Sequence, residues 1–189
     1  MFIQTEETPN PSTLKFIPGR MLLEDGTLEF KSKEEAKKNS LASKLFGENN
    51  VRGVFIGRDF LTVTKSGEVD WEILKPTVLS IILDFFSMGG EIEKILPDPK
   101  PATEEIEYSK KDQEIVKKIN ELLEERIKPA VAQDGGDINF VKLQKGIVFL
   151  ELRGACSGCP SSTITLKSGI ENMLKYYIPE IDSVEAINQ

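Results

Sequence analysis

The sequence predicts an α+β protein, with two small α+β domains joined by a proline-rich linker. One observation is the break between them: residues 97–101 carry proline at every second position, and mixed charges follow. Proline disfavours helix and removes a backbone donor, so residues 91–111 should be an extended linker. A second observation is that both flanking segments contain short strand-like runs between turn residues together with helix-like apolar spacing. We therefore expect domains at residues 1–90 and 112–189.

The first domain should contain four strands and two helices. We expect strands at residues 2–6, 13–17, 51–56 and 60–65, and helices at residues 33–48 and 76–87. Pro76 suits the first turn of the second helix, which is apolar nearly all round and should be deeply buried. The segment Thr8–Pro11 is interpreted as a rigid turn between strands, in preference to a partner-docking loop, and Trp71 as a core or domain-edge aromatic.

The second domain should follow the order helix, strand, strand, loop, helix, strand. We expect helices at residues 112–127 and 160–178, a hairpin of residues 138–143 and 147–152, and a last strand at residues 184–187. Ile164 and Tyr177 are among the expected core positions of the second helix. The segment Asp134–Asp137 is interpreted as a turn that needs positive φ, in preference to an acidic metal loop.

Composition excludes several functional classes. The formal charge is −7, which argues against nucleic acid as a main partner. The most apolar stretch, residues 78–86, is too short to span a bilayer, and the N-terminus lacks the features of a signal peptide. We therefore expect no membrane partner and a cytoplasmic protein, with a mature organellar form as the alternative.

The most informative motif is Cys156-Ser157-Gly158-Cys159, which holds both cysteines of a chain that has no histidine. Two thiolates at this spacing can bind metal or exchange electrons, but they fill only half of a tetrahedral site. The simplest source of the missing ligands is a second copy of the chain. The absence of histidine also removes the commonest general base.

The loop that carries the two cysteines should be open. Pro160 fits a first helical position, which makes Cys159 the expected N-cap, and the partial positive charge of a helix N-terminus should lower the pKa of its thiol. Gly154 and Gly158 remove side-chain bulk around the sulfurs.

Four interpretations of the pair compete. An incidental pair is improbable in a chain with no other cysteine. Thioredoxin-type redox chemistry fits poorly, because proline follows Cys159 and no aromatic residue precedes Cys156. A zinc site shared by two chains and an iron–sulfur cluster bridged by two chains both need four thiolates, and the spacing does not separate them.

Several segments together carry a family resemblance. Residues 134–138, 154–162 and 165–171 resemble the NifU C-terminal domain, and residues 4–16 and 53–65 resemble the companion Nfu N-terminal domain. The extra scaffold and ferredoxin-like domains of full-length NifU have no counterpart here.

The resemblance implies a non-enzymatic carrier that assembles an iron–sulfur cluster and passes it to apo-proteins. Cys156 and Cys159 would bind a [4Fe-4S] cluster between two C-terminal domains, although four thiolates also suit [2Fe-2S]. The implied partners are a second copy, upstream assembly proteins and apo recipients, with the N-terminal domain selecting partners or modulating the loop. The alternatives are a thiol–disulfide or persulfide oxidoreductase and a zinc-bridged structural dimer.

Overall fold

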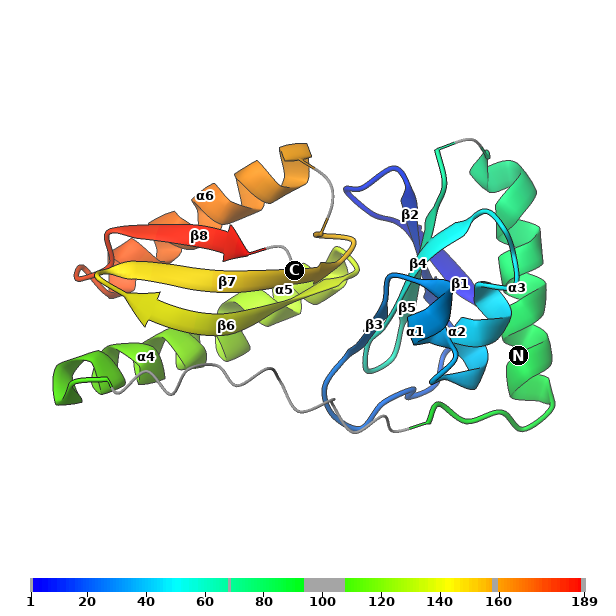
Figure 1. Ribbon diagram of the computed structural model, residues 1–189, viewed down its shortest axis with the longest axis horizontal. Coiled ribbons are helices and arrows are strands. Elements are labelled where there is room, and N and C mark those ends of the chain that lie inside the picture. Colours follow the sequence, from blue (N-terminus) through cyan, green and yellow to red (C-terminus); the bar gives the residue numbers. More distant parts are fainter. Residues whose placement is uncertain (1, 68, 94–107, 158–159, 188–189) are drawn as a thin grey trace. The chain divides into compact units, whose positions relative to one another are not determined.

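The computed structural model describes residues 2–67, 69–93, 108–157 and 160–187, with side chains of the last range described from Ile164 onward. The chain divides into two compact units, Met1–Leu96 and Pro97–Gln189 (Figure 1). Both units are α+β, as the sequence predicts. The boundaries of the expected linker stay a prediction, because residues 94–107 lie outside the described part.

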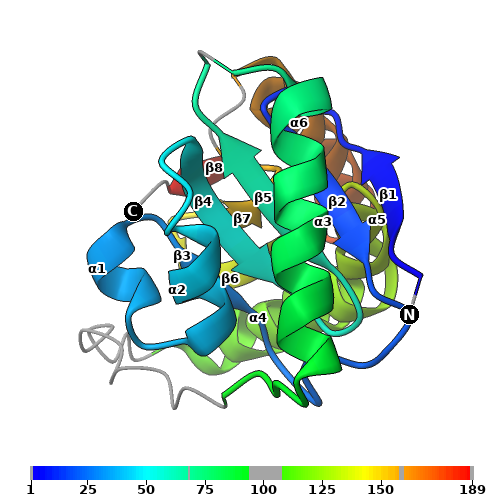
Figure 2. The ribbon, with the colours of Figure 1, turned by 90° about the vertical axis from the view of Figure 1, so that its right-hand side faces the viewer.

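The first unit is an antiparallel sheet of five strands with the order β1-β2-β5-β4-β3. Its strands are β1 (Gln4–Glu7), β2 (Thr13–Ile17), β3 (Leu28–Phe30), β4 (Val51–Ile56) and β5 (Leu61–Lys65). Its helices are α1 (Lys33–Ala36), α2 (Ser40–Leu45) and α3 (Trp71–Ser87), and all three lie on one face of the sheet (Figure 2). The core forms between that face and the helices, where Phe16, Leu61 and Val63 are fully buried.

The expected helices of this unit differ from the observed ones. Residues 33–48 form two short helices, because Asn39 has extended backbone and its side chain accepts from the Ala42 N–H, which starts α2 anew. Helix α3 begins at Trp71, so Pro76 lies inside it and not in its first turn. One side of α3 is buried, but Leu79, Ile81 and Leu83 are only partly buried, so the expectation that the whole helix is deeply buried was wrong.

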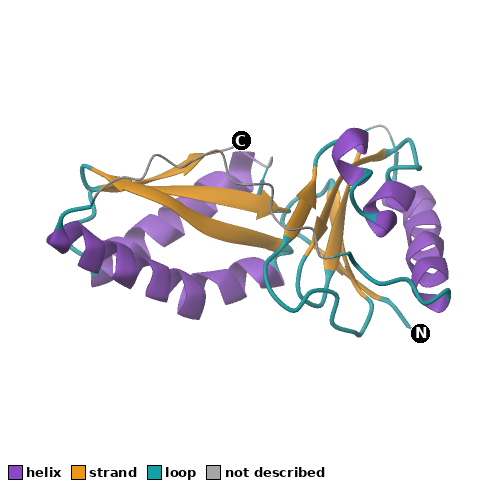
Figure 3. Cartoon of the chain, turned by 60° about the horizontal axis from the view of Figure 1, so that its bottom comes forward, coloured by secondary structure: helices purple, strands orange, loops and turns teal. Residues whose placement is uncertain are grey.

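The second unit has a three-stranded sheet of order β6-β7-β8, with its helices on one face (Figure 3). Its strands are β6 (Gly136–Gln144), β7 (Ile147–Gly154) and β8 (Ser183–Ile187). Its helices are α4 (Lys110–Leu122), the π-helical segment η1 (Leu123–Ile127), α5 (Lys128–Gln133) and α6 (Pro160–Tyr177). β6 and β7 form the expected hairpin, and β8 pairs with β7 in parallel.

The first helical stretch of this unit runs further than expected, from Lys110 to Gln133, and passes through a π-helical segment. Pro129 explains the wider turn. Its nitrogen has no hydrogen to donate to the carbonyl four residues earlier, and its ring crowds that carbonyl. The N–H of Lys128 accordingly bonds to the Leu123 carbonyl, five residues back.

The core of the second unit is separate from that of the first. The expected stripe on the first helical stretch is confirmed, with Ile115, Ile119 and Leu123 buried. On α6, Ile170 and Leu174 are buried, but Ile164 is 66% exposed and Tyr177 44%, so these two were wrongly placed in the core. Within the described residues, no helix is both long enough and apolar enough to cross a membrane.

Candidate functional site

Cys156 lies in the loop that follows β7, where the chain turns toward α6. β7 ends at Gly154, which has φ 65° and pairs with Gly136 at the start of β6. The N–H of Ala155 donates to the Gly135 carbonyl at 3.1 Å, so the loop is attached to the turn before β6. The N–H and hydroxyl of Ser157 donate to the Gly154 carbonyl at 3.1 and 2.9 Å, which closes a tight turn around Cys156.

The first residue of β6 and the turn before it leave space for the side chain of Cys156. A Cβ atom on Gly136 would lie 2.6 Å from the Cys156 sulfur and 2.7 Å from the Arg153 carbonyl oxygen. Gly135 has φ 81°, a conformation that side chains disfavour. The interpretation of residues 134–137 as a positive-φ turn is therefore confirmed, and its second glycine has a function that the sequence analysis missed. The glycine pair was visible in the sequence. The residue that Gly136 contacts, Cys156, lies twenty residues further along the chain, so the sequence did not show this contact.

The side chain of Cys156 is buried, which contradicts the expectation of an open sulfur at this position. It is 5% exposed and packs within the apolar core of the second unit. Burial raises the pKa of the Cys156 thiol to about 12, and the carboxylates of Asp134 and Asp137 add to the rise. Metal binding through Cys156 would have to displace the thiol proton and bring the sulfur out of the core.

Other expectations about the loop fall on Gly158 and Cys159, which lie outside the described residues. The N-cap position of Cys159 and its lowered pKa stay predictions. Helix α6 does begin at Pro160, as expected.

A second residue whose function the sequence analysis missed is Glu171, which lies in α6. One of its carboxylate oxygens accepts from the Val184 N–H of β8 at 3.0 Å, and the other accepts from the Lys175 ammonium at 2.7 Å. The hydrogen bond from Lys175, with that from Val184, lowers the pKa of the Glu171 carboxyl. Glu171 thus fastens α6, which follows the cysteine loop, to the third strand of the sheet.

The described residues offer no complete metal site within one chain. No group of three or more histidine, cysteine, aspartate or glutamate side chains among them could hold a metal ion. A metal site that includes Cys156 therefore needs ligands beyond those that the described residues bring together.

Two family models match the two units. The model described as scaffold protein Nfu/NifU N terminal matches residues 3–89, and the NifU-like domain model matches residues 119–185. These matches fit the resemblance that the sequence motifs carry.

Curated relatives match over nearly the whole chain. The human protein named NFU1 iron-sulfur cluster scaffold homolog, mitochondrial, is 47% identical over 99% of this chain and 72% of its own length. NifU-like protein 4, mitochondrial, from Arabidopsis thaliana is 48% identical over 98% of this chain, which spans 65% of that relative. Among solved structures, the NMR structure of a NifU-like protein from Saccharomyces cerevisiae is 28% identical, with a TM-score of 0.46 over 50% of this chain and 87% of that one. The whole-length similarity and the two matched domains place the chain in one family: it belongs to the Nfu family of iron–sulfur cluster scaffold proteins.

Proposed function

We propose that this Nfu-family scaffold carries an iron–sulfur cluster on Cys156 and Cys159 and delivers it to apo-proteins. The observation that carries the proposal is that these are the only cysteines of a scaffold-family chain that has no histidine. The chain is a scaffold and not an enzyme, in line with the names of its relatives.

The cluster is proposed to be a [4Fe-4S] cluster bridged between two copies of the chain. Four thiolates hold such a cluster, and each copy supplies two. The same number of thiolates also holds [2Fe-2S], so the iron content per dimer decides between the two. Binding links two chains, so self-association should follow cluster loading.

Release of the cluster would proceed by ligand exchange. A thiolate of the recipient replaces one Cys156 or Cys159 thiolate at a time, so that each iron–sulfur bond broken is matched by one formed. The displaced Cys156 sulfur then takes up a proton, since burial favours the neutral thiol, and packs back into the apolar core. A site that stabilises its unloaded form in this way favours delivery over retention.

The partners we propose are upstream cluster-assembly proteins, which load the site, and apo iron–sulfur proteins, which receive the cluster. The curated relatives carry "mitochondrial" in their names. We therefore favour the organellar alternative over the cytoplasmic expectation, and localising a tagged full-length protein in its own cells tests this choice.

Anaerobic reconstitution with iron and sulfide tests the function. Absorption, iron content and oligomeric mass are recorded together on the full chain. The proposal expects broad visible absorption, about four irons per two chains and dimers that form only on loading. Colourless protein that retains zinc would favour the structural dimer, and a monomer that reduces disulfides without taking up iron would favour the oxidoreductase.

Substitution tests the ligands. Cys156→Ser and Cys159→Ser should each abolish stable cluster binding, while the circular dichroism of the chain stays unchanged. If either variant bound as much cluster as the unsubstituted chain, the substituted cysteine would not be a cluster ligand.

A further inference from the structure

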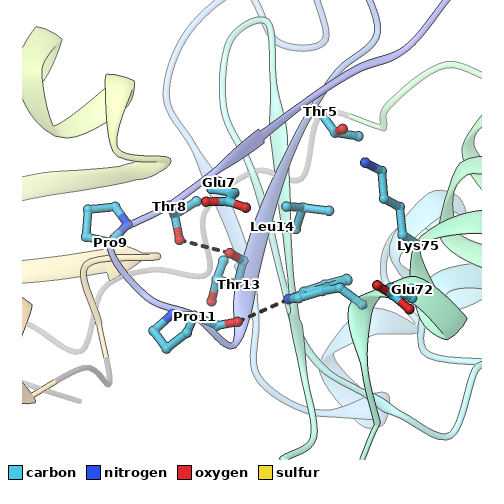
Figure 4. Close-up of a pocket in the computed structure, with 10 residues that line it drawn as sticks. Thr5, Glu7, Thr8, Pro9, Pro11, Thr13, Leu14, Glu72 and Lys75 are labelled. Carbon is cyan, nitrogen blue, oxygen red and sulfur yellow. Dashed lines mark hydrogen bonds between the residues drawn. The ribbon is translucent and has the colours of Figure 1, made fainter.

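The first unit carries a groove that cluster binding does not use. It has a volume of about 540 Å³ and lies between the β1–β2 hairpin and the N-terminal half of α3 (Figure 4). We call it the β1–α3 groove and define it by six of its lining residues: Thr5, Glu7, Leu14, Trp71, Glu72 and Lys75.

One wall of the groove is the edge of the sheet. β1 is the outermost strand and pairs only with β2 among the described strands. The outer edge of such a strand presents backbone N–H and C=O groups that another extended chain can pair with. Thr5 and Glu7 lie opposite Phe16 and Leu14 of β2, so they point to the same face of the sheet as the helices.

The other wall is fixed by Trp71. Its ring packs edge-on against Phe16, with centroids 6.4 Å apart, and its Nε1–H donates to the Pro11 carbonyl at 3.1 Å. The turn at that end is rigid, because the Thr8 hydroxyl is within hydrogen-bonding distance of the carbonyls of Asn10 and Thr13, at 2.9 Å each. The groove therefore keeps its shape without an occupant.

Three charged side chains line the groove, and none of them is neutralised by a partner within the described residues. The carboxylates of Glu7 and Glu72 and the ammonium of Lys75 form no ion pair there, in contrast to Lys15, which pairs with Glu6 on the other face of the sheet. In Figure 4, Glu72 and Lys75 border the space on the α3 side, and Glu7 borders it on the β1 side.

The spacing of these groups matches an extended peptide. Trp71 and Lys75 are four residues apart on a helix, which is about 6 Å along its axis. Residues i and i+2 of a strand are about 6.6 Å apart and point to the same side. A strand added to β1 can therefore place one side chain at Trp71 and the next one on that side at Lys75.

From this we infer that the β1–α3 groove binds an extended segment of another protein as an additional strand on β1. The segment carries an arginine that stacks on Trp71 between the carboxylates of Glu7 and Glu72, and an acidic residue two positions away that meets Lys75. Backbone pairing supplies attraction that does not depend on sequence, and the charges supply selectivity. The site is independent of cluster binding, so it stands or falls separately from the proposed function.

Trp71 is the only tryptophan of the chain, so its fluorescence reports on the groove alone. The full-length chain is titrated with the acetylated and amidated peptide Thr-Val-Arg-Val-Glu-Val-Thr. We expect a saturable change in Trp71 emission. Replacing the arginine of the peptide by glutamine, or methylating its backbone nitrogens, should weaken binding about threefold or more.

Matched variants locate the effect on the protein. Glu72→Gln and Glu7→Gln should each weaken binding of the arginine peptide, whereas Asp84→Asn, an exposed position of α3 outside the groove, should leave it unchanged. Glu72→Lys should in turn prefer a peptide with glutamate in place of the arginine.

Three outcomes would overturn the proposal. One is equal affinity of the Glu72→Gln and Asp84→Asn variants for the arginine peptide. Another is full affinity of the N-methylated peptide, which would exclude strand addition. The third is an equal emission change with free arginine alone, which would make the groove a small-molecule site.

Discussion

At the scale of single residues, Gly136 constrains the cysteine loop that follows β7. In Gly136→Ala, the added Cβ would meet the Cys156 sulfur and a backbone carbonyl, and the backbone has little room to move. We expect a loss of about 1–3 kcal/mol in the free energy of unfolding, together with reduced iron loading. Urea unfolding and iron content after reconstitution measure the two effects.

Gly169→Ala is the matched control for this substitution. Gly169 lies in α6 with nothing within 4 Å of an added Cβ, so alanine should stabilise the helix by about 0.5–1 kcal/mol. If both substitutions changed stability in the same direction, the contact between Gly136 and Cys156 would not be the cause.

The burial of Cys156 predicts low thiol reactivity. Its pKa of about 12, against an ordinary value of 9.0, leaves far less thiolate at about pH 8 than an unfolded chain would hold. In a Cys159→Ser variant, alkylation of Cys156 by iodoacetamide should be at least about tenfold slower in the folded chain than in urea. Mass spectrometry follows the reaction, and equal rates would mean that the sulfur faces solvent.

At the scale of elements, the bond from Glu171 to β8 predicts a dependence of stability on pH. The pKa of this carboxyl is lowered in the folded chain, chiefly by the Lys175 ammonium and then by the Val184 N–H. Its ionised form therefore stabilises the fold at pH values above its ordinary pKa, and this contribution is lost as pH falls through the lowered value.

Glu171→Gln should accordingly destabilise the chain at about pH 7 and destabilise it less at about pH 3. Urea unfolding of both proteins at the two pH values gives the comparison. Glu180→Gln, an exposed position after α6, is the control and should behave like the unsubstituted chain. A deficit in Glu171→Gln that is the same at both pH values would rule out the charge as the cause.

Helices and strands with a distinctive local residue pattern could be predicted from the sequence. Elements that depend on contacts with distant parts of the chain could not. The β-branched runs gave β2 and β4 with their observed bounds, and turn residues gave the hairpin of the second unit. β3 was missed, because three residues are too few for their alternation of apolar and polar side chains to stand out, and the strand forms by pairing with β4. Pro76 misled the placement of α3, because the helix begins five residues earlier and passes through this proline.

At the scale of the whole molecule, the sequence motifs identified the cysteine pair but not its environment. Cys156 was predicted as a ligand from its residue type, its spacing from Cys159 and the family resemblance, and that role stays a prediction. Its burial follows from packing against a glycine twenty residues earlier in the chain, which no local pattern reports. Sequence spacing tells which atoms can bind metal, whereas the cost of exposing them depends on the tertiary fold.

The two separate cores predict that the units unfold independently. Leu61 lies fully buried in the first core and Leu174 in the second, so replacing either by alanine should cost its own unit about 2–5 kcal/mol. Trp71 reports on the first unit only. Leu61→Ala should therefore lower the urea midpoint of Trp71 fluorescence and leave iron loading intact. Leu174→Ala should reduce iron loading and leave that midpoint unchanged. A shift of the Trp71 transition in Leu174→Ala would mean that the two units unfold together.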